Sequence, residues 1–160
     1  MARDIVLGLG NILNHDEGLG VHALAALEAG LGSHQQFELV DGGTMGLSLL
    51  QLVEACDHLL IVDAVNAGVP PGTVVELGCD EIPLYAGVKL SQHQVTFQEV
   101  LGLAKIRGRL PTHVYLIGVQ PADLSIGVGL SATVTAAMPR LVVRAADVLR
   151  GWGLVEAEIA

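Results

Sequence analysis

A nearly unbroken apolar run from His58 to Val65 (HLLIVDAV) constrains the fold of this chain more than any other feature. Such a run, bounded by a polar turn and a Gly/Pro-containing loop, is typical of a strand buried on both faces of a parallel sheet. A sheet of that kind needs helices over both faces, so the run predicts a layered α/β fold. Asp63 interrupts the run, and a carboxylate there is costly unless it is paired, hydrogen-bonded or bound to a metal.

The rest of the chain alternates between strand-like runs and segments with helical spacing. Further strands are predicted at residues 5–7, 37–40, 73–77 and 114–119, and helices at 17–31, 45–55, 95–107 and 131–150. Loops are predicted at residues 66–72, 78–94 and 121–129. Pro139 is expected to kink or restart the last helix, because proline lacks the amide donor.

This alternation predicts one domain over residues 1–160, a three-layer α/β/α sandwich around a mostly parallel, twisted sheet of about five strands. With 8 Lys+Arg against 17 Asp+Glu the net charge is −9, which argues against nucleic-acid and anionic-membrane binding. The two cysteines have no local partner and fit a reducing compartment. We expect a cytoplasmic protein, without a membrane span or signal peptide.

Polar residues follow three of the predicted strands, where sites of parallel α/β sheets are found. They are Asn11 to Glu17 after the first strand, Asp41 to Thr44 after the second, and Asp63 in the third. The loop around His93 can reach the same edge. Each residue also has a purely structural explanation, since Asp16 or Glu17 can complement a helix dipole, Asp63 can cap a turn and His93 can be a solvated loop residue.

Two other kinds of site are disfavoured by the sequence. Gly8-Leu9-Gly10 begins like a dinucleotide fingerprint, but Leu13 stands where the third glycine is required, although Asp41 does follow the second strand. Cys56 sits in Ala-Cys-Asp-His, which is interpreted as the turn before a buried strand, so the thiol is predicted to be buried rather than nucleophilic. A metal site built from Glu17, Asp63 and His93 remains the third alternative.

Considered together, the motifs resemble those of the nickel–iron hydrogenase maturation proteases. The resemblance extends from about residue 4 to residue 150. The matching segments are GLGNIL at 8–13, DEGLGV at 16–21, DGGT at 41–44, IVDA at 61–64, SQHQ at 91–94, LIGVQP at 116–121 and LSATV at 130–134.

The resemblance implies a set of site residues. Glu17, Asp63 and His93 correspond to the family's metal-binding positions, and Asp41 to Thr44 to an element near the site. Two carboxylates and an imidazole suit nickel or zinc and leave coordination positions open. His15 is interpreted as a bystander, the alternatives being a fourth ligand or a hydrogen bond to Asp16.

The family's activity implies an endopeptidase that removes the C-terminal extension of the nickel-loaded precursor of a [NiFe] hydrogenase large subunit. The nickel is expected to arrive with the substrate, and zinc or cadmium to substitute in vitro. Glu17, Asp63 and, more weakly, Asp16 are the candidate catalytic carboxylates. Either the metal polarises the scissile bond or activates water, or a carboxylate acts as general base while nickel positions the substrate; we favour the second.

The resemblance also implies a monomer that meets its precursor transiently. Two other classes remain open at this point. One is a non-catalytic, metal-sensing chaperone of the large subunit, which would bind the precursor without changing its mass. The other is a nucleotide-binding α/β domain, which would be stabilised by nucleotides rather than by nickel, cadmium or zinc.

Overall fold

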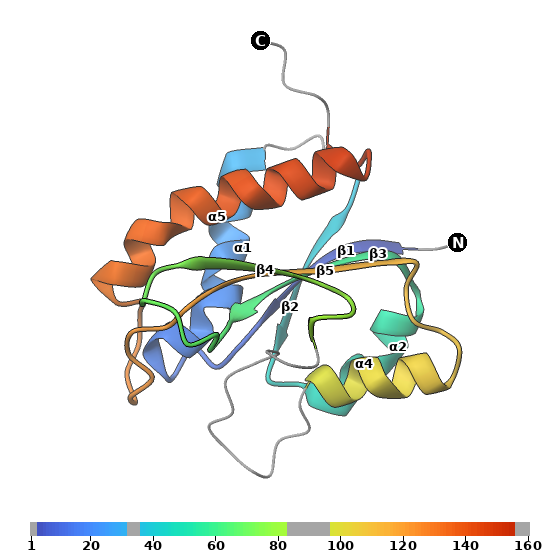
Figure 1. Ribbon diagram of the computed structural model, residues 1–160, viewed down its shortest axis with the longest axis horizontal. Helices are drawn as coiled ribbons and strands as arrows, with labels where there is room; N and C mark the ends of the chain where they lie inside the picture. The colour runs from blue at the N-terminus through green and yellow to red at the C-terminus, as the bar shows by residue number, and fades with distance from the viewer. Residues whose placement is uncertain (1–2, 32–35, 83–96, 156–160) are drawn as a thin grey trace.

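One mixed sheet organises the part of the chain that this computed structural model describes, residues 3–31, 36–82 and 97–155 (Figure 1). Its strands are β1 Arg3–Leu9, β2 Glu38–Gly43, β3 Cys56–Ala64, β4 Val74–Gly78 and β5 His113–Val119. The α-helices are α1 Leu19–Leu31, α2 Leu50–Glu54, α4 Phe97–Ile106 and α5 Ala132–Gly151, with 3₁₀ helices η1 His15–Gly18 and η2 Gly46–Leu49. Helices α1 and α5 cover one face of the sheet, and α2 and α4 cover the other.

The strand order is β2-β1-β3-β5-β4, with parallel pairing everywhere except between β4 and β5. This confirms the predicted three-layer fold with a mostly parallel, five-stranded sheet. The antiparallel edge has a simple cause. The connection of residues 65–73 is too short to return the chain to the amino ends of the parallel strands. Strand β4 therefore starts near the carboxyl end of β3 and runs in the reverse direction.

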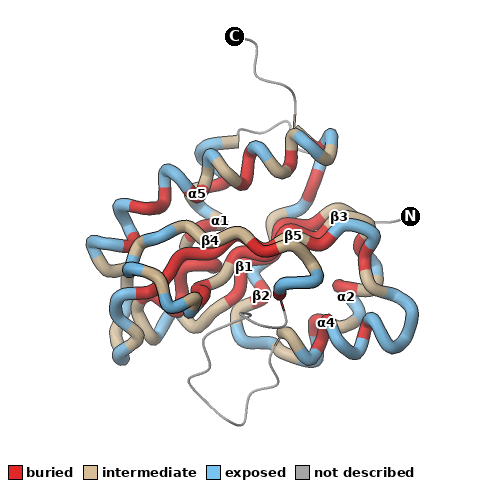
Figure 2. Tube along the Cα trace, in the orientation of Figure 1, coloured by how far each residue is buried: buried red, intermediate tan, exposed pale blue. Residues whose placement is uncertain are grey.

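Strand β3 lies at the centre of the sheet and is buried on both faces, as the apolar run predicts (Figure 2). Leu60 and Val62 pack into the layer formed with α1 and α5, whereas Leu59 and Ile61 pack into the layer formed with α2 and α4. Each of these side chains is fully buried. Burial of one such side chain contributes about 1.5–3 kcal/mol, so β3 joins the two halves of the core.

Several element boundaries differ from the sequence prediction. Strand β1 extends over Arg3–Leu9 rather than residues 5–7. Strand β2 extends through Gly43, so Asp41, Gly42 and Gly43 belong to the strand rather than to a turn. Strand β3 begins at Cys56, so the Ala-Cys-Asp-His segment is mostly strand. Strand pairing explains the differences in β2 and β3, because β1 pairs with Gly43 at one end and with Cys56 at the other.

Helix α5 continues through Pro139, so of the two expected effects, a kink or a restart, the restart does not occur. Its apolar side packs on the sheet while Pro139 is exposed, so water can satisfy the carbonyl that the proline leaves free.

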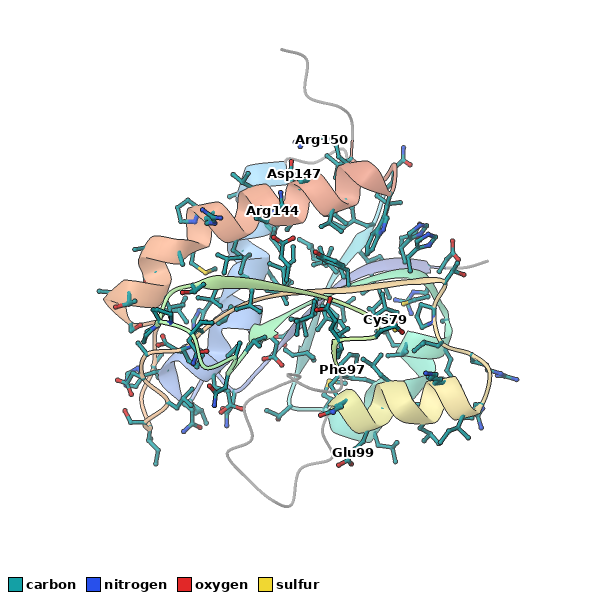
Figure 3. All side chains as sticks on the ribbon, in the orientation of Figure 1. Cys79, Phe97, Glu99, Arg144, Asp147 and Arg150 are labelled. Atoms are coloured by element: carbon teal, nitrogen blue, oxygen red, sulfur yellow. The ribbon has the colours of Figure 1, made fainter. Side chains whose placement is uncertain are left out.

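Arg144 on α5 contacts Glu76 of β4 and Asp147, each at 2.9 Å (Figure 3). Among the helices of the described residues, none is long and apolar enough to cross a membrane.

Candidate active site

Glu17 and Asp63 come together at the carboxyl ends of two neighbouring strands. Glu17 lies on η1, which follows β1, and Asp63 lies one residue before the end of β3. Strands β1 and β3 are paired, and the charge of Glu17 acts on Asp63, whose pKa it helps to raise. The structure therefore brings together these two residues of the predicted site.

Glycines bring η1 and α1 close enough to the sheet for this contact. A Cβ on Gly20 would collide with the carbonyl oxygens of Leu9 and Val62, and a Cβ on Gly8 would collide with that of Gly20. Gly10, at φ +131°, leaves no room for a Cβ beside the Glu17 carbonyl. The glycines of the GLGN and DEGLG segments thus hold Glu17 against the end of the sheet.

Replacing Gly20 with alanine tests this close packing. We expect Gly20→Ala to lower the free energy of unfolding by about 1–3 kcal/mol, because backbone atoms cannot move aside as a side chain can. Gly102→Ala is the matched control, since that helical glycine has open space around it and alanine favours helix by about 1 kcal/mol. Urea unfolding measures both, and a stabilised Gly20→Ala variant would contradict the packing argument.

The Glu17 carboxylate is buried without a full set of partners. The residue is 7% exposed, and its Oε2 atom has no hydrogen-bond partner. Burial raises the pKa of Glu17 to about 7. An unpartnered buried acceptor is destabilising, and a cation or a substrate group bound beside Glu17 would remove that cost.

Asp63 is half-buried, and its pKa is raised as that of Glu17 is. Burial raises its pKa to about 7, the Glu17 charge adds to this effect, and the hydrogen bond from the Ala64 amide opposes it. That amide donates to Oδ1 at 2.8 Å. Two neighbouring carboxyls with pKa values near 7 can exchange protons at neutral pH, which is the property required of a general acid or base.

Asp16, the neighbour of Glu17, is fully buried and fully hydrogen-bonded. The Ala122 and Asp123 amides donate to Oδ2 at 2.9 Å, as does the Ser131 hydroxyl at 2.8 Å, and the Ser131 amide donates to Oδ1 at 2.8 Å. Desolvation by burial tends to raise the pKa of Asp16, but these hydrogen bonds outweigh it and lower the pKa. Asp16 thus connects η1 to the N-cap of α5.

The side chain of His15 contacts the loop after β5. Its Nδ1 donates to the Gly129 carbonyl at 2.9 Å, rather than to Asp16. Its ring fills the space where a Cβ on Gly127 would lie, and its backbone has φ +42°. These contacts fit the interpretation of His15 as a bystander that holds two loops together.

The DGGT element lies beside the same edge of the sheet. Gly42 is buried against the side chains of Leu7 and Leu9, and the Gly10 amide donates to the Gly43 carbonyl at 3.0 Å. Asp41 is exposed. The element therefore joins the end of β2 to the loop that leads to Glu17.

The remaining predicted residues have different outcomes. His93 lies outside the described residues. Cys56 is buried and its thiol donates to the Leu52 carbonyl at 3.1 Å. The prediction of a buried thiol is confirmed. Burial raises the pKa of Cys56 to about 11, which the nearby Arg3 opposes, and a raised pKa makes a thiol a weaker nucleophile at neutral pH.

Gln120 supports the site in a way that the sequence analysis missed. This buried residue accepts a hydrogen bond from the Ala67 amide at 2.8 Å and donates to the Asn66 side chain at 3.2 Å. It thereby fixes the loop that follows Asp63. The signal in the sequence was a polar residue directly after the apolar run of β5.

A second polar cluster lies at the opposite ends of the strands. His58 Nδ1 is 2.8 Å from Asp4 Oδ1 and 3.4 Å from Asp57 Oδ2, and the His58 ring stacks on that of His113 at 4.4 Å. The cluster joins the amino ends of β1, β3 and β5. It explains the polar residues at the start of β3 by mutual pairing.

Comparison with known proteins assigns the chain to a family. The family model described as HycI hydrogenase maturation protease matches residues 21–148. The chain belongs to the hydrogenase maturation protease family. The protein is therefore a peptidase, which argues against both the nucleotide-binding and the non-catalytic chaperone alternatives.

Individual relatives agree in sequence and in fold. The chain is 43% identical over 154 residues to the hydrogenase expression/formation protein HupD of Rhizobium leguminosarum bv. viciae, covering 95% of this chain and 76% of that protein. It is 40% identical to the hydrogenase 2 maturation protease of Escherichia coli, covering 84% and 82% of the two chains. The solved hydrogenase maturating endopeptidase HybD of Escherichia coli superposes with a TM-score of 0.83 at 36% identity, covering 94% of each chain.

Proposed function

We propose that this peptidase removes the C-terminal extension of the nickel-loaded precursor of a [NiFe] hydrogenase large subunit. The observation that carries the proposal is the pairing of two carboxylates, Glu17 and Asp63, at the carboxyl ends of neighbouring strands. Glu17 is buried and has an oxygen without a hydrogen-bond partner, and Asp63 is half-buried. Family membership supports the reaction class. We further propose that the protein acts as a monomer in the cytoplasm.

Glu17, Asp63 and His93 are the residues that would bind the nickel carried by the precursor. Carboxylate oxygens and an imidazole nitrogen form a donor set that nickel and zinc accept, and cadmium is a further substitute in vitro. The unpartnered Glu17 Oε2 fits this assignment, since a cation beside it would offset the cost of burying two neighbouring carboxylates. When bound, the metal supplies a positive charge that fixes the precursor and polarises nearby groups.

The protein's own residues then position and hydrolyse the peptide bond. A carboxylate of the pair, Glu17 or Asp63, takes a proton from water as the water oxygen attacks the scissile carbonyl carbon. The proton passes to the amine as the carbon–nitrogen bond breaks. Burial raises the pKa of both carboxyls to about 7 in the protein without metal, which favours proton uptake. A bound nickel ion would oppose this effect, so the carboxylate that acts as base is the one held less strongly by the metal.

We assign Asp16 a positioning role rather than that of the base. Its two oxygens already accept hydrogen bonds from Ala122, Asp123 and Ser131, and its lowered pKa makes it a poor proton acceptor. Through these contacts Asp16 fixes the segment that carries Glu17.

The proposal is tested by the intact mass of a hydrogenase large-subunit precursor incubated with this protein, with and without prior nickel loading. We expect a C-terminal peptide to be lost only from the nickel-loaded precursor. Glu17→Gln should abolish this loss, whereas Glu28→Gln, at an exposed glutamate of α1, should leave it intact. A stable complex with unchanged mass would replace the proposal with the chaperone alternative, and processing without nickel would overturn the metal requirement.

A further inference from the structure

Four exposed aliphatic side chains lie on two loops that adjoin the segment carrying Glu17. They are Ile12 and Leu13 in the loop after β1, and Ile126 and Val128 in the loop after β5. Ile126 is 89% exposed and Val128 is 75% exposed. We refer to these four residues as the apolar rim.

The apolar rim is one surface because its two loops are hydrogen-bonded to each other. The Gly127 amide donates to the Leu13 carbonyl at 2.8 Å, and the His15 amide donates to the Gly127 carbonyl at 3.0 Å. The Asp16 amide also donates to the Asp123 carbonyl at 2.9 Å. The exposed side chains thus stand on loops that are bonded to the segment carrying Glu17.

The chemistry of the apolar rim is unusual for this chain. Residues 11–14 and 124–130 contain no charged side chain, although the chain carries a net charge of −9. The Gly10–Gly43 hydrogen bond connects the first loop to the end of β2, where Met45 and Leu47 are also exposed. A surface of this kind favours an uncharged, aliphatic partner over a basic one.

We propose that the apolar rim binds an aliphatic segment of the precursor polypeptide and so presents the scissile bond to Glu17 and Asp63. This inference rests on the proposed function. The substrate is the occupant that the position favours, because the rim is continuous with the loop that carries Glu17. A second copy of this chain seated there would obstruct the very edge that the precursor must reach.

The test compares two double variants in the cleavage of nickel-loaded precursor. Ile126→Asp with Val128→Asp should raise KM at least 10-fold and leave kcat within about 2-fold, because it weakens docking without touching the carboxylates. Ile106→Asp with Val143→Asp is the matched control, since these exposed aliphatic residues lie on α4 and α5. The control should leave KM unchanged, and the conservative variant Ile126→Leu with Val128→Ile should keep KM close to that of the wild type.

The outcomes separate this inference from the proposed function. If the wild type cleaves normally and the Ile126/Val128 aspartate variant has an unchanged KM, the docking role of the apolar rim is overturned and the proposed function stands. If the wild-type protein does not cleave the precursor, the proposed function fails, and precursor binding to the wild-type and rim variants still tests the surface. A wild-type dimer that becomes a monomer in the aspartate variant, with KM unchanged, would assign the rim to self-association and overturn the inference.

Discussion

Asp63→Asn is expected to reduce precursor processing at least about 100-fold while making the metal-free protein more stable at pH 8. Loss of activity follows because asparagine can neither accept a proton nor supply a carboxylate to nickel. The gain in stability follows because the substitution removes a buried charge next to that of Glu17. The Ala64 amide can still donate to the side-chain oxygen of asparagine, so the local structure is preserved.

The raised pKa of Asp63 determines how the free energy of unfolding changes with pH. The pKa of Asp63 is about 7 in the folded protein and ordinarily 3.8, so the folded state holds its proton more tightly than the unfolded state does. The stability linked to this proton is complete below about pH 4 and is lost as the pH rises through about 7. The pKa difference corresponds to roughly 4 kcal/mol, and Glu17 acts in the same direction.

Urea unfolding at pH 5 and pH 8, in the presence of a chelator, measures the effect. The wild-type protein should lose several kcal/mol between the two pH values, and Asp63→Asn should lose less and be the more stable of the two at pH 8. Asp80→Asn, at an exposed aspartate after β4, is the control and should follow the wild type. Equal pH dependence in Asp63→Asn and wild type, or normal processing by the variant, would contradict the assignment of Asp63.

Asp16→Asn is expected to have the opposite effect on stability, lowering the free energy of unfolding by about 2–4 kcal/mol at pH 7. Both Asp16 oxygens accept hydrogen bonds from groups of the Ala122–Ser131 segment. An asparagine keeps one oxygen, so its NH₂ group must face a donor in either orientation. Because the pKa of Asp16 is lowered, its contribution is complete at pH 7 and is lost only as the pH falls below about 4.

Asp123→Asn is the matched control for this variant. Asp123 is an exposed aspartate of the same loop whose carboxylate accepts hydrogen bonds from the Ser125 amide and hydroxyl. Its replacement should cost less than about 1 kcal/mol. Urea unfolding and precursor processing are both measured, and Asp16→Asn should lose both stability and processing activity. Equal stabilities of the two variants would show that Asp16 does not anchor η1.

Much of the fold was predictable from local patterns. The apolar run at residues 58–65 predicted the central parallel strand, and helical spacing predicted α1, α4 and α5 within a few residues. The ends of β2 and β3 were not predictable, because Asp41-Gly42-Gly43 has turn-forming residues whose extended conformation depends on pairing with β1. The continuity of α5 through Pro139 likewise depends on packing against the sheet.

The site divides in the same way between sequence and tertiary structure. The sequence by itself determined that Glu17 follows one strand of the sheet and that Asp63 lies in another, since a charged residue in or after an apolar run is visible without coordinates. Only the tertiary structure decided the roles of adjacent residues: Asp16 is satisfied by four hydrogen bonds from a loop more than a hundred residues away, while Glu17 Oε2 has none. The physical reason is that a carboxylate's pKa and function depend on burial and hydrogen-bond donors, which distant segments supply.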